Sequence, residues 1–181
     1  MVVEETYLRG CYVITPKVFK DERGFFLESF NKKTFFTETG INSNFVQDNL
    51  SKSSKGVLRG LHFQVGKAAQ SKLVQVIKGK VLDVCVDLRK DSPTFGKHFS
   101  IELDGINKKQ FYVPRGFAHG FVVLEDDTIF SYKCDNYYNK PSESGIIFND
   151  KYLNINWGLA EKDMIISEKD KNLPTFENLF R

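Results

Sequence analysis

Hydrophobic and polar residues alternate along much of the chain after residue 57, which predicts β-strands. The alternation is clearest in segment 81–88, where one alternating set is entirely hydrophobic and the other is mixed. The hydrophobic set is Leu82, Val84, Val86 and Leu88, and the mixed set is Val81, Asp83, Cys85 and Asp87. Because successive side chains of a strand point to opposite faces, this segment predicts a strand with one hydrophobic face and one more polar face.

Short turns separate the predicted strands. Lys78-Gly79 lies between segments 73–77 and 81–88, an arrangement typical of a β-hairpin. Further strands are predicted over 110–113, 120–124 and 128–134. The acidic triplet 125–127 between the last two predicts a second hairpin loop. Short strands at this spacing favour a sandwich or a barrel over alternating strands and helices.

Helical signals are few. Asn31 is a suitable N-cap for a helix over 32–39, and Gly40 is suited to end that helix in a left-handed conformation. Segment 21–24 predicts a turn before a phenylalanine-rich run. The charged stretch after residue 149 predicts turns and short helices on the outside. The whole pattern predicts an all-β barrel with a small helical fringe.

Length and hydrophobic content predict one domain. A chain of 181 residues, 41% of them hydrophobic, can close one substantial core. No repeat or linker divides it. We expect a single domain, residues 1–181, composed of N-terminal strands and a helix in 1–50, the barrel core in 51–148 and C-terminal turns and short helices in 149–181.

Charge, targeting signals and cysteines exclude several classes of protein. The net charge is only +3, and the basic and acidic residues are interspersed, so we expect no nucleic-acid partner. The N-terminus lacks a signal-peptide pattern and no run of 18 apolar residues occurs, so we expect no membrane contact and a cytoplasmic location. Cys11, Cys85 and Cys134 are odd in number and lack a CxxC spacing, which indicates reduced thiols.

Two histidines lie in glycine-containing boxes. His62 lies in Leu-Arg-Gly-Leu-His-Phe-Gln, and His119 in Pro-Arg-Gly-Phe-Ala-His-Gly, which resembles the Pro-x-Gly-x-x-His box of the cupin superfamily of small β-barrels. Many cupins bind a metal through three histidines and a glutamate. Here Gln64 replaces the second histidine, and 67–72 contains no acidic residue. Two imidazoles without a carboxylate make a poor metal site, so we expect no metal and an interior suited to proton transfer.

Eight segments together resemble the dTDP-4-dehydrorhamnose 3,5-epimerases of deoxysugar synthesis. These segments are 21–28, 47–51, 58–64, 70–76, 79–84, 87–96, 113–121 and 167–170. The resemblance implies a cupin-type jelly-roll barrel, a homodimer, a dTDP-sugar substrate and no cofactor. It also implies conversion of dTDP-4-dehydro-6-deoxy-D-glucose to dTDP-4-dehydro-L-rhamnose. Both inverted carbons, C3 and C5, flank a ketone, so the reaction needs a base, a proton donor on the opposite face and a cation near the ketone oxygen.

The resemblance also implies roles for individual side chains. His62 would be the base and Asp170 would orient its ring, whereas Tyr132 would donate a proton on the opposite face. Lys72 would stabilise the enolate oxygen. Contacts with the sugar, diphosphate or nucleotide are implied for Arg23, Glu28, Gln47, Asn49, Arg59, Lys72, His119, Glu143 and Lys169.

Without the resemblance, several of these residues also have structural interpretations. His119 could tie strands together, Lys72 could be a solvated edge charge, and Arg23 could be a solvated loop charge. Tyr132 competes with Tyr137 and Tyr138. Asp83, on the more polar face of its strand, could line a pocket or pair with a lysine.

Three other functions stay open at this point. The nearest alternative is a single-site epimerase, at C3 or C5, or a ketoisomerase of another deoxysugar pathway on the same fold. A metal-dependent cupin enzyme and a sugar-binding module without turnover are the alternatives from other classes. Glycine-rich nucleotide loops of dehydrogenases and kinases do not occur in the sequence.

Overall fold

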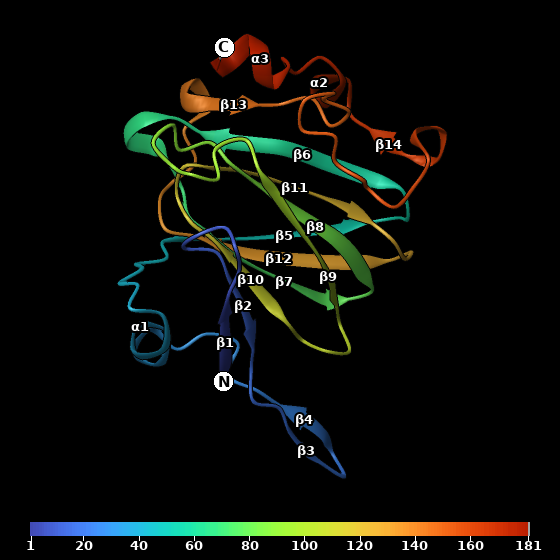
Figure 1. The fold of residues 1–181 in the computed structure, drawn as a ribbon. Coiled ribbons are helices and arrows are strands. Elements are labelled where there is room, and N and C mark those ends of the chain that lie inside the picture. The colour runs from blue at the N-terminus through green and yellow to red at the C-terminus, as the bar shows by residue number, and fades with distance from the viewer. Residues whose placement is uncertain (181) are drawn as a thin grey trace.

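Two antiparallel sheets packed face to face form the body of the protein, in a computed structural model that describes residues 1–180 (Figure 1). The first sheet has the spatial order β1 (Val2–Glu5), β2 (Tyr12–Thr15), β10 (Gln110–Val113), β7 (Lys72–Lys78), β12 (Thr128–Cys134) and β5 (Gln47–Ser53). The second has the order β13 (Glu143–Gly145), β6 (Val57–Gln64), β11 (Phe117–Val123), β8 (Lys80–Asp87) and β9 (His98–Asp104). The all-β jelly-roll prediction is confirmed.

The two predicted hairpins are wrong, although their strands exist. Strand β7 belongs to the first sheet and β8 to the second, so the Lys78-Gly79 turn carries the chain from one sheet to the other. Residues 125–127 likewise connect β11 of the second sheet to β12 of the first. A tight turn after an alternating segment therefore marks a corner of the barrel here rather than a hairpin.

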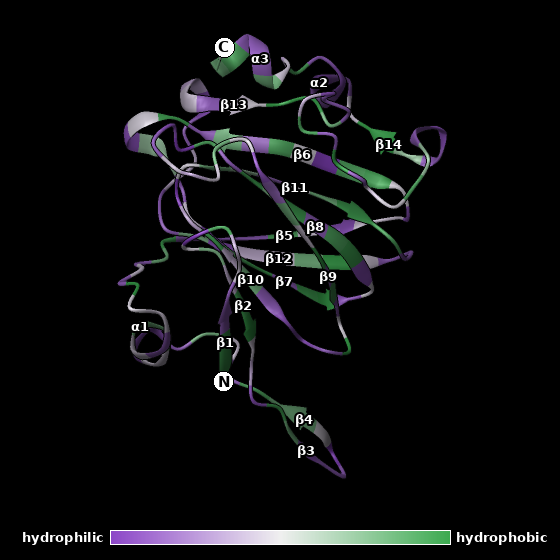
Figure 2. Ribbon diagram, viewed as in Figure 1, coloured by the Kyte–Doolittle hydropathy of each residue, from purple (hydrophilic) through white to green (hydrophobic). Residues whose placement is uncertain are grey.

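The main hydrophobic core lies between the two sheets. Val74 and Phe130 of the first sheet meet Cys85 and Phe121 of the second, and the Phe121 and Phe130 rings stack with centroids 4.1 Å apart. Figure 2 shows β8 and β11 as largely hydrophobic. Every residue of β11 is buried. Phe121 and Phe130 of this core also line a cavity between polar side chains of the two sheets.

The C-terminal segment covers the outer face of the second sheet. Its short strand β14 (Ile165–Ile166) pairs in parallel with β6, and the helices α2 (Glu168–Lys171) and α3 (Phe176–Phe180) follow (Figure 1). Trp157 and Phe176 of this segment pack with Val84 and Val86. Both faces of β8 are consequently buried, and its more polar face, with Asp83, points between the sheets rather than to solvent.

The remaining helices are short. The predicted N-terminal helix is confirmed as α1 (Lys32–Thr39), in which Asn31 accepts a hydrogen bond from the Thr34 N–H and Gly40 adopts φ 71°. The 3-10 turns are η1 (Gly66–Ala68), η2 (Lys140–Ser142) and η3 (Glu161–Asp163). Among residues 1–180, no helix is long and apolar enough to cross a membrane.

A two-stranded arm extends away from the barrel. Strands β3 (Phe19–Asp21) and β4 (Gly24–Phe26) pair only with each other, and Figure 1 shows them beyond the N-terminal end of the first sheet. Every residue of both strands is exposed, including Phe19, Phe25 and Phe26. Exposed aromatic rings on an extended arm are typical of a surface that contacts another molecule.

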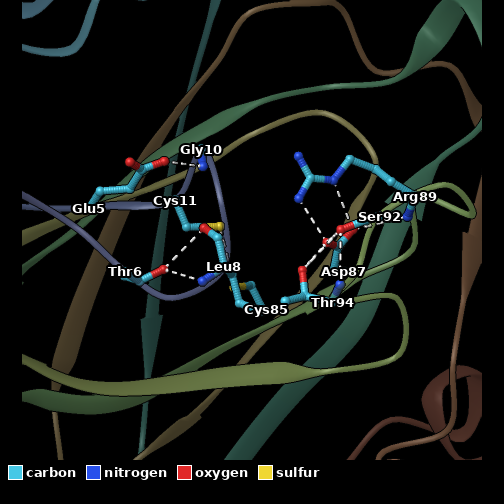
Figure 3. A network of polar contacts seen from close by, with 10 residues as sticks. All are labelled: Glu5, Thr6, Leu8, Gly10, Cys11, Cys85, Asp87, Arg89, Ser92 and Thr94. Carbon is cyan, nitrogen blue, oxygen red and sulfur yellow. Dashed lines mark hydrogen bonds and ion pairs between the residues drawn. The ribbon is translucent and has the colours of Figure 1, made fainter.

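Asp87 organises the loop that follows β8. Its carboxylate, which has no exposure to solvent, accepts hydrogen bonds from Arg89 Nε at 2.8 Å, Ser92 Oγ at 2.6 Å and Thr94 Oγ1 at 2.7 Å (Figure 3). These bonds replace the water that the buried charge has lost. Nearby, the two buried thiols of Cys11 and Cys85 lie 3.9 Å apart.

Candidate active site

A cavity of about 700 Å³, lined by side chains of both sheets, adjoins a smaller space of about 120 Å³. The residues that line both spaces are Asn49, His62, Lys72, His119 and Tyr132. Asn49, Lys72 and Tyr132 come from the first sheet, and the two histidines come from the second. The barrel thus brings together residues that are far apart in sequence.

His62 and Asp170 form a hydrogen-bonded dyad. His62 Nε2 lies 2.7 Å from Asp170 Oδ1, and the Gly60 N–H donates to Asp170 Oδ2 at 3.3 Å. The Asp170 side chain is nearly buried, whereas that of His62 is 29% exposed. Burial alone would raise the pKa of Asp170, but the hydrogen bond and positive charge of His62 hold it below its ordinary value. The dyad therefore consists of an ionised carboxylate behind an accessible imidazole.

The short helix α2 places Asp170 at the dyad. Ser167 is its N-cap, and its Oγ accepts a hydrogen bond from the Asp170 N–H at 3.1 Å. Before this cap, Ile165 and Ile166 pair with Val57 and Leu58 at the start of β6. The C-terminal segment is thus anchored on the strand that carries His62.

A second histidine and carboxylate pair lies deeper in the barrel. His119 Nε2 lies 2.9 and 3.0 Å from the two carboxylate oxygens of Asp83, and His119 pairs directly with His62 in the β-ladder. Burial lowers the pKa of His119 and raises that of Asp83, while their mutual attraction opposes both shifts. Burial therefore opposes protonation of the His119 ring.

Tyr132 and Lys72 face the dyads from the first sheet. Lys72 Nζ lies 6.0 Å from the centre of the Tyr132 ring, and Lys72 forms no ion pair with any residue of 1–180. Desolvation lowers the pKa of Lys72. Desolvation raises the pKa of Tyr132; the nearby Cys134 raises it further, and the positive charge of Arg59 partly offsets the increase. Burial also raises the pKa of Cys134 to about 11. At neutral pH this wall therefore presents a protonated phenol beside a lysine whose burial opposes its positive charge.

Several predicted substrate contacts surround the same cavity. Arg59 and Lys169 line the larger space, and Gln47 and Glu143 line the smaller one. The Gln47 side chain donates to Asn49 Oδ1 at 3.0 Å. Arg59 and Lys169 provide positive charge for an anionic group.

Arg23 and Glu28 do not reach this cavity within the chain. Arg23 pairs with Asp21 on the extended arm, where its side chain is 83% exposed. Glu28 accepts a hydrogen bond from Asn31 Nδ2 at 2.9 Å at the start of α1. Neither residue lines either space of the cavity. The chain therefore does not bring Arg23 and Glu28 to the cavity with the other predicted contacts.

The side chains present do not fit a cupin metal site. Within residues 1–180, no three His, Cys, Asp or Glu side chains come together as a metal would require. His62 and His119 are each hydrogen-bonded to a separate carboxylate. Gln64, at the position of a second metal-binding histidine, accepts a hydrogen bond from the Asn139 N–H at 2.7 Å.

Three residues of the site received no role from the sequence. Gln64 lines the smaller space, and the period-two alternation that places it on the face of His62 could have indicated this. Tyr138, considered only as an alternative to Tyr132, donates its hydroxyl to Glu143 Oε2 at 3.0 Å. Ser167 could have been found as a capping serine three residues before Asp170.

A jelly-roll barrel with an imidazole–carboxylate pair, a tyrosine and a buried lysine around one cavity has the fold of a cupin and side chains suited to acid–base chemistry. The family model for dTDP-4-dehydrorhamnose 3,5-epimerase matches residues 5–178. The chain belongs to the dTDP-4-dehydrorhamnose 3,5-epimerase family.

Individual relatives resemble the chain over nearly its whole length. A dTDP-4-dehydrorhamnose 3,5-epimerase of Shigella flexneri is 51% identical over 172 residues, which cover 95% of this chain and 94% of the relative. The dTDP-4-dehydrorhamnose 3,5-epimerase of Elizabethkingia anophelis is 59% identical in sequence, and its crystal structure superposes with a TM-score of 0.95. The match covers 98% of this chain and 97% of that enzyme's chain. A Legionella pneumophila 3,5-epimerase in complex with dTDP-4-keto-L-rhamnose is 47% identical, with a TM-score of 0.94, covering 99% and 94%.

Proposed function

We propose that this chain is an isomerase that converts dTDP-4-dehydro-6-deoxy-D-glucose to dTDP-4-dehydro-L-rhamnose by inverting C3 and C5. The observation that carries the proposal is the His62–Asp170 dyad, which lines the same cavity as Tyr132 and Lys72. The similarity to enzymes of this name supports the choice of substrate.

His62 is the proposed base. Its Nε2 is held by Asp170, so Nδ1 is the ring nitrogen that remains to accept a proton from a carbon beside the ketone. After transfer, the imidazolium charge is stabilised by the ionised Asp170 carboxylate. The partial exposure of His62 gives its ring access to a ligand in the cavity.

Tyr132 and Lys72 complete the proposed chemistry. Removing a proton beside the ketone moves negative charge onto the ketone oxygen, and the ammonium of Lys72 is suited to stabilise that charge. Tyr132, from the opposite sheet, returns a proton to the other face of the carbon. Its raised pKa keeps the phenol protonated until the enolate takes the proton.

Binding contacts are proposed for the other residues around the cavity. Arg59 and Lys169 are suited to the diphosphate, because their cations line the larger space. The amides of Gln47 and Asn49, the ring of His119 and the carboxylate of Glu143 offer hydrogen bonds to the sugar or the base. We propose no metal and no cofactor, since proton transfer at these carbons needs neither.

We also propose a homodimer in which the β3–β4 arm supplies Arg23 to the cavity of a second copy, with Glu28 close to the same boundary. The exposed aromatic residues of the arm support this arrangement, because they offer apolar area for an interface. A cytoplasmic location is proposed as well. It is supported by three free cysteines, two of which have sulfur atoms within 3.9 Å without a disulfide.

Solvent-exchange kinetics test the proposed function. The 4-keto sugar nucleotide is incubated with the protein in deuterium oxide, and the label at each carbon is followed by NMR. Label at both C3 and C5, with formation of the L-rhamno product, is expected. Label at one carbon would instead support the single-site epimerase. His62→Ala should abolish exchange at both carbons, and an unchanged rate in this variant would contradict the proposed base.

A further inference from the structure

Helix α2 contacts the barrel through two side chains. Asp170 reaches His62, and its neighbour Lys169 reaches Glu143, with Nζ and Oε2 2.6 Å apart. The other ion pair of the helix, Lys171 with Glu168 at 2.7 Å, stays within the helix and does not touch the barrel. The position of Asp170 thus depends on a helix of only one turn, held by few contacts.

The Lys169–Glu143 link is built on the same β-ladder as His62. In the pairing of β13 with β6, Gly145 lies opposite His62 and Glu143 lies opposite Gln64. Tyr138 also donates its hydroxyl to the carboxylate oxygen that binds Lys169. The backbone of Glu143 is therefore held by the β-ladder and its carboxylate by Tyr138, independently of its ion pair with the helix.

We propose that the Glu143–Lys169 ion pair braces α2 against β13 and so holds Asp170 against His62, which makes both residues positioning residues for the dyad. This inference rests on the proposed role of His62 as the base, and adds to the substrate contacts proposed for the same two residues. A displacement of the carboxylate by about 1 Å is enough to impair a catalytic constellation. The Glu143–Lys169 ion pair lies two residues along the β13–β6 ladder from His62, so it opposes a displacement of Asp170 from the His62 ring.

The charges around His62 are consistent with this arrangement. The C-terminal helix α2 contributes Asp170 and Lys169, and β13 contributes Glu143. Within the second sheet, Arg59 comes from β6, Asp83 from β8 and His119 from β11. The first sheet contributes Lys72 from β7 and Tyr132 from β12. Burial raises the pKa of Glu143, but Lys169, Tyr138 and the nearby His62 together hold it below its ordinary value. Glu143 is thus held ionised where it meets the Lys169 ammonium.

Substrate contact alone and positioning predict different kinetics. If Glu143 and Lys169 only bound substrate, removing either would raise KM and leave kcat unchanged. If they position the dyad, removing either lowers kcat. Because they act as one unit, the double variant should be little worse than the worse single variant.

The experiment compares Glu143→Gln, Lys169→Met and the double variant with Lys171→Met. The last removes the same charge from the same helix without affecting the brace, so it is the matched control. We expect kcat to fall roughly 3- to 10-fold in both single variants, with no further multiplication in the double variant, and no change in Lys171→Met. The limb of the kcat profile on the acid side should move to lower pH by a few tenths of a unit in Lys169→Met, whereas loss of the Lys169 cation alone would move it to higher pH.

An NMR titration of the His62 ring separates failure of this inference from failure of the proposed function. The ring pKa is measured without turnover, in the parent protein and in Lys169→Met. Loss of a nearby cation alone would raise the ring pKa, whereas withdrawal of Asp170 lowers it, so a lower ring pKa in the variant supports the brace even if the parent does not turn over the dTDP sugar. An unchanged or higher ring pKa, together with effects on KM alone that multiply in the double variant, would overturn it.

Discussion

Asp83 presents both carboxylate oxygens to Nε2 of His119, and neither side chain has appreciable contact with solvent. The neighbouring His62 instead has one carboxylate oxygen at 2.7 Å and an exposed ring edge. The barrel thus contains two His–Asp pairs, one fixed in the interior and one open to a ligand. This difference supports the choice of His62 rather than His119 as the proposed base.

Asp83→Asn should chiefly reduce stability. The amide offers one acceptor in place of two, and its NH2 group competes with the hydrogen bond that His119 needs. A lost or poorly satisfied buried hydrogen bond costs about 1–3 kcal/mol. We expect a decrease of that size in the free energy of unfolding, measured by urea denaturation at pH 7. Unchanged stability would show that the buried pair contributes nothing beyond packing.

Asp170→Asn should chiefly reduce catalysis. The amide is nearly isosteric, but it neither stabilises the imidazolium nor fixes the tautomer that leaves Nδ1 free to accept a proton. Replacement of the carboxylate in a comparable dyad lowers kcat by about 10⁴, so we expect a loss of at least about 10² here. Steady-state turnover of the parent and the variant measures it. A kcat within about two-fold of the parent would exclude the dyad from the mechanism.

The sequence predicted the strands better than their partners. Alternation identified segment 81–88, but it carries no information on which sheet the next strand joins, so turns at Gly79 and 125–127 were interpreted as hairpins when they cross between sheets. The burial of Asp83 was also outside the reach of periodicity. It depends on the first sheet packing over the face of β8 that carries Val81, Asp83 and Cys85.

The site was predictable only in part, because its residues come together from segments that are far apart in the sequence. His62 and His119 lie in recognisable boxes, whereas Asp170 is 108 residues from His62 and had no signal of its own except the family resemblance. Pairing of Glu143 with Lys169 depends on the position of α2 over β13, which local sequence does not encode. Arg23 could not be placed at all, because its arm leaves the barrel.

Acid should destabilise the protein through Asp87. Burial tends to raise its pKa, but hydrogen bonds from Arg89, Ser92 and Thr94 lower it from 3.8 to about 2. Because the folded pKa is depressed, this stabilisation is complete above about pH 4 and is lost as the pH falls towards 2; a shift of this size corresponds to about 2 kcal/mol.

Asp87→Asn should therefore be less stable than the parent at pH 7 and less sensitive to pH between 4 and 2. Urea denaturation at several pH values measures both effects. Asp91→Asn, at an exposed carboxylate of the same loop, is the control for the change in net charge. Parallel pH profiles for the parent and Asp87→Asn would contradict the prediction.

Tyr132→Phe should separate proton removal from proton return. The variant keeps the ring packed beside Phe130 but lacks the hydroxyl. We expect deuterium exchange at the substrate carbons to persist, while net inversion falls by about 10² or more because the donor is missing. Tyr137→Phe, at a tyrosine that is 66% exposed, should behave like the parent. Equal inversion rates in Tyr132→Phe and the parent would remove this tyrosine from the mechanism.

Gly60→Ala should displace the proposed base, His62, from Asp170 without replacing any titratable side chain. Gly60 has φ +132°, and a Cβ atom there would lie 2.5 Å from the Gly120 Cα and 3.0 Å from the His119 carbonyl oxygen. Strands β6 and β11 would have to separate, which would shift both histidines and the Gly60 N–H that donates to Asp170. Strand separation can be told apart from backbone strain by a matched control. Gly24→Ala serves this purpose, because Gly24 has φ +129° and no atom within 4 Å of the added Cβ.

Both variants place an alanine at a similar positive φ, which costs of order 1–3 kcal/mol, so any further loss of stability in Gly60→Ala measures the close approach of the two strands. We expect at least about 2 kcal/mol of additional destabilisation in thermal or urea unfolding, together with loss of turnover. Equal stability of the two variants would show that the strands can separate freely at this point.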